Sequence, residues 1–265
     1  RRPMTTVMTI VGTRPEIIRL SRVMARLDDT VNHVLVHTGQ NYDYELNGIF
    51  FDQLGIRRPD HFLDVDTSSL GRLLGETLIK AEQVLLAERP DAVLILGDTN
   101  SSIAAIIAKR MRIPVYHMEA GNRCFDENVP EETNRRLVDH VADYNLVYTE
   151  HARRNLLAEG LAPRRILLTG SPMKEVLDHH REAFDASTAT SDLGLTPRGY
   201  LLVSAHREEN VDDPMRLGAL LDCLIMARDA FEMPILVSTH PRTRKRLDRL
   251  VDRPGAAHRD LTGLT

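Results

Sequence analysis

Three isolated acidic residues of this 265-residue sequence follow apolar stretches or open a helix, where they could do acid–base chemistry. Asp98 comes just after the β-rich stretch 92–96, Glu119 comes just after 114–118, and Glu131 opens a predicted helix. Carboxyl groups that share one crevice can remove and return protons. Taken singly, Asp98 could instead cap the next helix and Glu131 could merely complement a helix N-terminus.

Alternating strands and helices are the elements that must position these residues. Apolar stretches of strand length occur at 6–11, 33–37, 62–65, 92–96, 114–118, 144–148 and 166–169. Strands that alternate with helices predict an α/β fold with a parallel sheet covered on both faces. The carboxyl ends of such strands border the ligand crevice, so we expect Asp98 and Glu119 to face one cavity.

A second, shorter α/β domain is predicted in the C-terminal part. Residues 181–198 are polar and lack a strong apolar period, so we interpret them as a linker between a first domain at 1–180 and a partial domain at 199–265. Clear strands are expected only at 200–205 and 234–239, whereas a doubly wound domain needs about five. We therefore expect the second domain to be incomplete.

Cationic residues near predicted strand ends indicate an anionic ligand. Arg14 lies between the first strand and a helix start, where N–H groups and a guanidinium can bind phosphate. His206 and Arg207 follow one strand of the second domain, and His240 follows another. We expect these groups to face the carboxylates of the first domain across a ligand. A solvated arginine and a structural histidine are the simpler alternatives.

Composition and motifs narrow the function classes. A formal net charge of −4 gives no general attraction to nucleic acid, so no nucleic-acid partner is expected. No stretch approaches the roughly 20 apolar residues of a membrane span. The start of the sequence leads straight into a strand, which predicts a cytoplasmic protein without a signal peptide. Cys124 and Cys223 are expected as free thiols, and no phosphate-loop, dinucleotide or metal motif predicts a cofactor.

Five sequence blocks, in order along nearly the whole chain, resemble the non-hydrolysing UDP-N-acetylglucosamine 2-epimerases. They are Gly12-Thr13-Arg14-Pro15-Glu16, Gly97-Asp98-Thr99, His117-Met118-Glu119-Ala120-Gly121, Pro130-Glu131-Glu132-Thr133-Asn134-Arg135 and Ser204-Ala205-His206-Arg207-Glu208. The resemblance implies two Rossmann-like domains of the GT-B type, a UDP-sugar between them, and a homodimer. It also implies that C2 of the sugar is inverted by elimination of UDP to a glycal and re-addition of UDP.

The blocks at 14–21, 37–47, 121–126 and 170–173 resemble one branch of that family more closely, the UDP-2-acetamido-2,6-dideoxy-L-talose 2-epimerases, or UDP-N-acetyl-L-fucosamine synthases. Arg19 stands where the hexosamine enzymes usually carry lysine, and Asn41 follows Gln40 where they carry histidine. Our main expectation is therefore that branch, acting in surface polysaccharide synthesis. A UDP-GlcNAc/UDP-ManNAc 2-epimerase is the alternative, followed by a GT-B glycosyltransferase and a non-catalytic nucleotide-sugar sensor.

The residue types and the resemblance together give a predicted site. We expect Asp98 and Glu131 to exchange protons, Glu119 to position the sugar or tune its neighbours, and His206 to assist, with Glu132 as the alternative to Glu131. The expected substrate-binding residues are Arg14, Arg19, Gln40, Arg123, Arg135, Arg207 and His240. Because clustered carboxylates repel one another, at least one should hold a proton at neutral pH.

Overall fold

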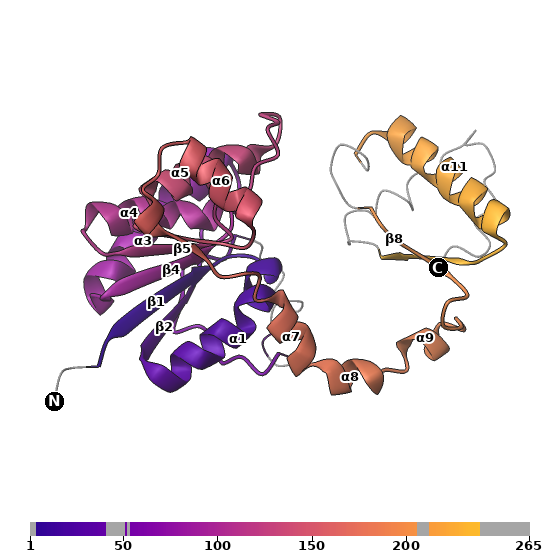
Figure 1. Cartoon of the computed structure of the whole chain (residues 1–265), viewed down its shortest axis with the longest axis horizontal. Coiled ribbons are helices and arrows are strands. Elements are labelled where there is room, and N and C mark those ends of the chain that lie inside the picture. The colour runs from indigo at the N-terminus through magenta and orange to yellow at the C-terminus, as the bar shows by residue number, and fades with distance from the viewer. Residues whose placement is uncertain (1–3, 41–50, 52–53, 206–211, 239–265) are drawn as a thin grey trace. The chain divides into compact units, whose positions relative to one another are not determined.

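The computed structural model describes residues 4–40, 51, 54–205 and 212–238, and the chain divides into two compact units, Arg1–Arg181 and Glu182–Thr265 (Figure 1). The predictions for Asn41, His206, Arg207 and His240 concern residues outside the described ranges. None of the helices described is both long and apolar enough for a membrane span.

The first unit is built on a seven-stranded sheet with the strand order β3-β2-β1-β4-β5-β6-β7. Its strands are β1 (Thr6–Val11), β2 (Asn32–His37), β3 (His61–Phe62), β4 (Ala92–Leu96), β5 (Val115–Met118), β6 (Tyr144–Val147) and β7 (Ile166–Leu168). All neighbouring strands are parallel, which confirms the predicted fold class. The order reverses between β1 and β4, and ligand crevices form at such switch points.

Strand β3 is shorter than the predicted stretch 62–65. It pairs with β2 only at His61 and Phe62. Asp64 adopts a left-handed backbone conformation with φ of 48°, which does not fit a strand. The apolar residues Leu63 and Val65 are still buried, so their hydrophobicity reflects packing against the core rather than strand pairing.

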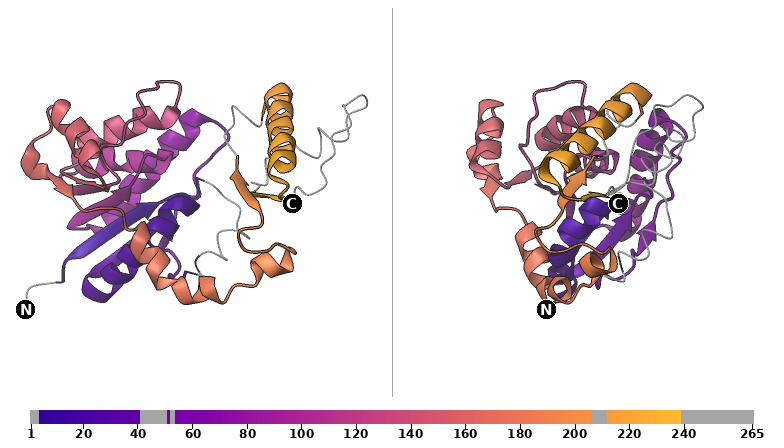
Figure 2. Two further views of the ribbon diagram at one scale, coloured as in Figure 1. Left: turned by 45° about the vertical axis from the view of Figure 1, so that its right-hand side comes forward. Right: turned by 90° about the vertical axis from the view of Figure 1, so that its right-hand side faces the viewer.

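Helices cover both faces of the sheet (Figures 1 and 2). The helices described in this unit are α1 (Arg14–Thr30), α3 (Leu70–Glu88), the 3-10 turn η1 (Asn100–Ile103), α4 (Ala104–Arg110), α5 (Pro130–Val141), α6 (Glu150–Ala158), the 3-10 turn η2 (Pro163–Arg165) and α7 (Met173–His179). Helix α1 packs on one face through one core cluster, whereas α3, α4 and α5 pack on the other face through a second cluster.

Local sequence explains why these elements form. In α1, the buried residues Ile17, Leu20 and Met24 recur at helical spacing on one face, and Pro15 suits the first turn. Along β4, Leu94 and Leu96 pack in the α1 cluster, whereas the alternating residues Val93 and Ile95 pack in the α3–α5 cluster. Both faces of the strand are therefore buried, as is usual in parallel sheets.

The second unit contains a strand–helix–strand arrangement. Strands β8 (Leu201–Ser204) and β9 (Ile235–Ser238) pair in parallel and are connected through α11 (Pro214–Phe231), whose first turn is capped by the Asp213 side chain. The stretch 181–198, predicted as a linker, contains the short helices α8 (Arg181–Asp185) and α9 (Ala189–Asp192). The described part of this unit therefore holds two parallel strands.

Candidate active site

Asp98 is the second residue past β4, at the switch point of the sheet. Gly97 turns the chain there with φ of 72°. Arg135 of α5 donates from Nε and Nη2 to Asp98 Oδ2 at 2.9 and 2.6 Å. Asn134, its neighbour on α5, donates to the Asp98 carbonyl at 3.0 Å. The alternative that Asp98 caps the next helix is wrong, because Thr99 occupies the N-cap position of η1 without a side-chain cap bond.

Glu119 lies directly past β5 and forms an ion pair with Arg19 of α1. Its side chain is 16% exposed. Burial raises the pKa of Glu119 more than the Arg19 ion pair lowers it, and the charge of Asp98 raises it further. Glu119 and Asp98 therefore lie close enough to interact, and the pKa of Glu119 lies above the ordinary value of a glutamate.

The two adjacent glutamates of α5 differ in their surroundings. Glu132 is 2% exposed, accepts from Cys124 N at 3.2 Å and pairs with Arg135 Nη1 at 3.0 Å. Burial acts to raise the pKa of Glu132, but these donors outweigh it and the pKa is lowered. Glu131 is exposed and makes no hydrogen bond or ion pair within the described part of the chain. Since it precedes Arg135 by one helical turn, it lies on the helix face that contacts Asp98.

The loops after β1, β2 and β4 interlock beside these carboxylates. Thr38 Oγ1 and Ser101 Oγ lie 2.6 Å apart, and Gln40 Oε1 accepts from the N–H and hydroxyl of Ser101 at 3.1 and 3.0 Å. Gly12 fits only because it lacks a Cβ, which would lie 1.8 Å from Ser101 Oγ. Arg14 begins α1 next to this junction and is half-buried. The predicted ligand residues Arg14 and Gln40 thus follow the carboxyl ends of β1 and β2, and Asp98 follows that of the adjacent β4.

Arg123 is not placed where a substrate-binding residue would be expected. Its side chain is fully buried, with Nη1 on Asp139 at 2.7 Å and Nε and Nη2 on the two carboxylate oxygens of Glu159, each at 2.7 Å. A guanidinium with these partners ties α5 to the end of α6. This position is at odds with the expected substrate contact, so Arg123 has no place in the function proposed below.

Glu16 is a buried group of this site that the sequence analysis did not select. Its Oε2 accepts from Gly12 N–H at 3.0 Å and from the Thr13 hydroxyl at 2.8 Å, and its Oε1 accepts from the Thr99 hydroxyl at 3.1 Å. Burial raises the pKa of Glu16 to about 7 despite these donors. The carboxyl group therefore links the start of α1 to the loop that carries Asp98.

Tyr148 is a second unselected group. It follows β6 just as Glu119 follows β5, and its hydroxyl is buried without a hydrogen-bond partner in the described part of the chain. Burial raises the pKa of Tyr148, and the charge of Glu119 adds to the effect. Asp98 and Glu119 were selected because they follow the ends of predicted strands. Tyr148 was missed because the strand was predicted to include it, at 144–148, whereas β6 ends at Val147.

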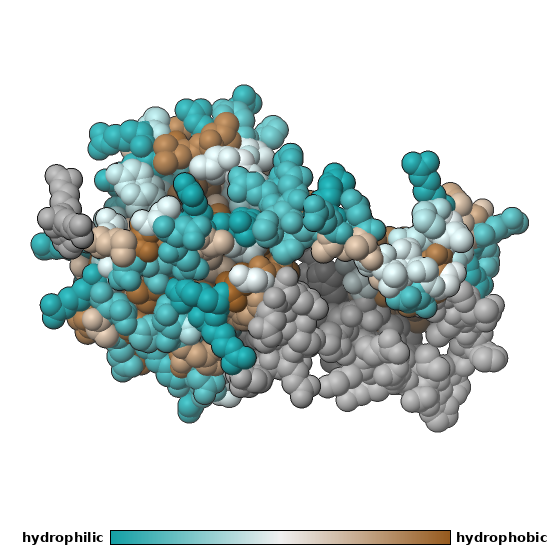
Figure 3. Space-filling model, turned by 90° about the horizontal axis from the view of Figure 1, so that it is seen from below, coloured by the Kyte–Doolittle hydropathy of each residue, from teal (hydrophilic) through white to brown (hydrophobic). Residues whose placement is uncertain are grey.

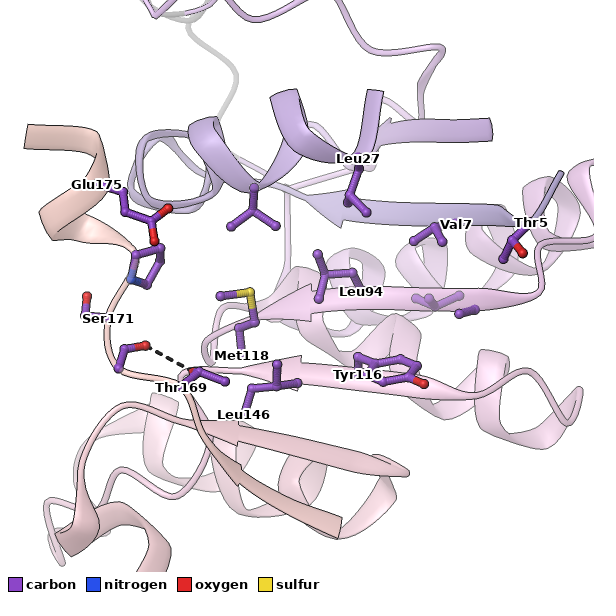
Figure 4. A pocket seen from close by; sticks show the side chains of 15 residues that line it. Thr5, Val7, Leu27, Leu94, Tyr116, Met118, Leu146, Thr169, Ser171 and Glu175 are labelled. Atoms are coloured by element: carbon purple, nitrogen blue, oxygen red, sulfur yellow. Dashed lines mark hydrogen bonds between the residues drawn. The ribbon is translucent and has the colours of Figure 1, made fainter. Parts of the chain in front are cut away.

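A mostly apolar cavity of about 530 Å³ lies elsewhere in the first unit, between α1 and the sheet (Figure 4). Leu27 lines it from α1, Leu94 and Tyr116 line it from the sheet, and Glu175 lies at its edge. Hydrophobic residues also reach the surface in patches between hydrophilic ones (Figure 3). A lining with so few polar groups does not suit a diphosphate, so we place the candidate site at Asp98 and Glu119 instead.

Comparison with known proteins identifies the family. Residues 25–260 match the family described as UDP-N-acetylglucosamine 2-epimerase. A UDP-2,3-diacetamido-2,3-dideoxy-D-glucuronate 2-epimerase from Pseudomonas aeruginosa is 39% identical over 252 residues, which are 92% of this chain and 69% of that protein. The names of the relatives support the expected family, but they do not show the expected L-talose branch.

Two solved structures are similar over most of this chain. That of a UDP-N-acetylglucosamine 2-epimerase from Rickettsia bellii has a TM-score of 0.87 at 48% identity and covers 99% of this chain and 68% of its own. The Methanocaldococcus jannaschii UDP-GlcNAc 2-epimerase, in complex with UDP-GlcNAc and UDP, has a TM-score of 0.84 at 35% identity and covers 92% and 68%. This chain spans about two thirds of their length, so its second domain is incomplete relative to theirs. By profile, sequence and fold, the chain belongs to the UDP-N-acetylglucosamine 2-epimerase family of isomerases.

Proposed function

We propose that the protein is a non-hydrolysing UDP-N-acetylhexosamine 2-epimerase. In the proposed reaction a base removes the C2 proton while the C1–O bond to UDP breaks, which gives a glycal. UDP then adds back at C1 and C2 receives a proton on the opposite face. Each turnover balances, because one proton leaves and one returns and UDP is released and recaptured.

The observation that carries this proposal is the pair of carboxyl groups at neighbouring strand ends. Asp98 follows β4 and Glu119 follows β5, and the two interact electrostatically. Each is held by an arginine from a helix, Asp98 by Arg135 and Glu119 by Arg19. Removal of one proton and delivery of another require two acid–base groups that can both reach the sugar.

The surroundings of the two groups support different roles. Asp98 binds Arg135 through Oδ2 only, and Oδ1 accepts no hydrogen bond from a described residue, so Oδ1 is the oxygen that can take the C2 proton. Glu119, whose pKa is raised by burial, is the group that can supply a proton. Glu131 remains a candidate for the second proton donor, because its side chain is exposed on the helix face next to Asp98.

The anionic part of the substrate needs cations and N–H donors. We propose that Arg14 and the N-terminus of α1 bind the diphosphate and stabilise its charge as it leaves C1. His206, Arg207 and His240 were selected from the sequence for the same purpose, and they lie outside the described residues. Gln40 and Arg135 are proposed to contact the sugar from the edge of the sheet.

The comparisons favour UDP-GlcNAc as substrate over UDP-2-acetamido-2,6-dideoxy-L-talose. The ligands named for the Methanocaldococcus jannaschii relative are UDP-GlcNAc and UDP, and the Pseudomonas aeruginosa relative is named for a diacetamido-glucuronate. The L-talose substrate stays a second candidate because Arg19 and Asn41 depart from the pattern of the hexosamine enzymes. Turnover of both UDP-sugars by the full-length protein decides between them.

Incubation of the full-length protein with UDP-GlcNAc in heavy water tests the function. The proposed epimerase places deuterium at C2 and forms the C2 epimer, both of which NMR detects. A GT-B glycosyltransferase would need an acceptor and would leave C2 protonated, and a nucleotide-sugar sensor would bind without turnover. Absence of C2 exchange with both candidate UDP-sugars would refute the proposal.

A further inference from the structure

A wholly buried histidine lies beneath the turn that carries Asp98. His117 is on β5, two residues before Glu119, and its side chain is 0% exposed. Its Nε2 lies 2.7 Å from the Gly97 carbonyl oxygen, and its Nδ1 lies 2.9 Å from Asp139 Oδ1. The carbonyl can only accept, and so can Asp139 as a carboxylate, so both ring nitrogens donate to these partners. With an ionised Asp139, this geometry calls for a doubly protonated, positively charged imidazole.

Asp139 of α5 balances that charge inside the unit. It is 0% exposed and also accepts from Gly121 N–H and from Arg123 Nη1. Arg123 in turn pairs with Glu159, at the end of α6. Opposite charges therefore alternate from His117 through Asp139 and Arg123 to Glu159, which is how buried charges are tolerated.

We propose that His117 is a positioning residue for Asp98: its charged ring holds the Gly97 carbonyl and thereby fixes the turn from which the Asp98 carboxylate projects. The proposal rests on the proposed function, because it assigns His117 a task only if Asp98 acts on substrate. Gly97 has φ of 72°, and its carbonyl is turned towards His117 rather than into a helix or strand. Without the His117 donor, this carbonyl would be buried without a partner.

The charge of His117 also acts on the carboxyl groups of the site. Burial lowers the pKa of His117, but the hydrogen bond and charge of Asp139 outweigh burial and raise it, with a further contribution from Asp98. The cation in turn lowers the pKa of Glu119, which Arg19 also lowers and Asp98 raises. Loss of the His117 charge should therefore move the Glu119 pKa upward.

Two variants separate positioning from simple packing. His117→Gln removes the charge and replaces the rigid ring that holds the Gly97 carbonyl with a shorter, flexible amide. Asp139→Asn leaves His117 in place and keeps the shape of the residue 139 side chain. It removes the anion that keeps His117 charged. His61→Gln is the matched control, because His61 lies 2.7 Å from Glu88 in a similar pair at the far edge of the sheet. Each protein is checked for folding by circular dichroism and thermal unfolding.

Two measurements on the full-length protein then test the proposal. Nitrogen-15 NMR of histidine-labelled wild type should show both His117 ring nitrogens protonated at pH 7.5. In C2 deuterium exchange, His117→Gln and Asp139→Asn should lower kcat by about 100-fold with little change in KM, since a misplacement of about 1 Å can have that effect. The limb of the pH–rate profile that reports Glu119 should move to higher pH, whereas His61→Gln should match wild type.

The possible failures are distinguishable. A wild-type protein without C2 exchange would refute the proposed function, and the positioning role with it. Wild-type exchange together with a singly protonated His117, or with an unchanged kcat and pH profile in both variants, would refute the positioning role alone. If His117→Gln does not fold, Asp139→Asn and the NMR measurement still decide, because neither alters the histidine.

Discussion

Arg135 places two nitrogens on one oxygen of Asp98, with Nε and Nη2 at 2.9 and 2.6 Å from Oδ2. The guanidinium thus fixes the carboxylate from one side. Oδ1 has no hydrogen bond from a described residue, so a carbon-bound proton can be offered to it from the crevice. The same guanidinium donates from Nη1 to Glu132 at 3.0 Å. Glu132 therefore holds the Arg135 side chain in place independently of Asp98.

Asp98→Asn should give a folded protein that does not epimerise. The amide occupies the same space and can still bond Arg135 through its oxygen, but it cannot act as a base. Because general-base catalysis contributes about 10²- to 10⁴-fold, C2 deuterium exchange should fall by at least 10²-fold. Asp178→Asn, in an exposed ion pair with Lys174, is the control and should match wild type. Wild-type exchange in Asp98→Asn would remove Asp98 from the mechanism.

Arg19→Met should change the pH dependence of turnover. It removes the cation beside Glu119, so the pKa of Glu119, already raised by burial, should rise further. The limb of the kcat/KM profile that reports Glu119 should therefore shift to higher pH. Arg22→Met, one turn further along α1 and next to His179, serves as control. A profile that stays in place would show that Glu119 does not control turnover.

Glu131→Gln and Glu132→Gln should differ in which property they change, turnover or stability. Glu131 is exposed and bonds no described residue, so its replacement should leave the thermal unfolding temperature unchanged and lower turnover if it donates a proton. Glu132 is buried among donors that include Cys124 N and Arg135, so Glu132→Gln should lower the free energy of unfolding by about 2 kcal/mol. Equal stability of the two variants would contradict this assignment.

Glu16→Gln should flatten the pH dependence of stability. The pKa of Glu16 is about 7 in the folded unit and 4.5 without burial, so the folded state binds the extra proton between these values. The stabilisation is complete below about pH 4.5 and is lost as pH rises through about 7, a change of about 3 kcal/mol. The glutamine oxygen can still accept from Gly12 N–H and the Thr13 hydroxyl, and its amide nitrogen can donate to the Thr99 oxygen. Glutamine has no proton to lose in this pH range.

Urea unfolding followed by tyrosine fluorescence at pH 5 and pH 8 checks this expectation. The free energy of unfolding of Glu16→Gln minus that of wild type should be larger at pH 8 than at pH 5, by about 3 kcal/mol. Glu82→Gln, on the exposed side of α3, is the control for a general loss of charge. The same pH dependence in wild type and Glu16→Gln would mean that Glu16 is ionised in the folded protein at both pH values.

Much of the sheet of the first unit could be predicted because its strands depend on local sequence patterns. The bounds of β1 and β4 match the predicted stretches 6–11 and 92–96, since continuous apolar sequences with polar ends determine buried parallel strands. The rule that ligand groups follow strand ends selected Asp98 and Glu119, which the fold brings together. These inferences need only the sequence next to each residue.

The roles that depend on distant partners could not be predicted. Arg123 was expected to meet substrate, but its partners Asp139 and Glu159 are 16 and 36 residues away and come from two helices. Glu131 and Glu132 were interchangeable in the sequence, and only the packing of α5 shows which one is buried. No local pattern encodes which of several arginines will meet which carboxylate.

The missing side chain of Gly12 has a consequence for ligand choice. A methyl group there would lie 1.8 Å from Ser101 Oγ and 2.4 Å from Thr38 Oγ1, so it would force apart the segments that carry Asp98 and Gln40. Position 12 must therefore stay without a side chain if these segments are to keep their spacing. In the proposed epimerase, a change of sugar preference has to come from substitutions at other positions.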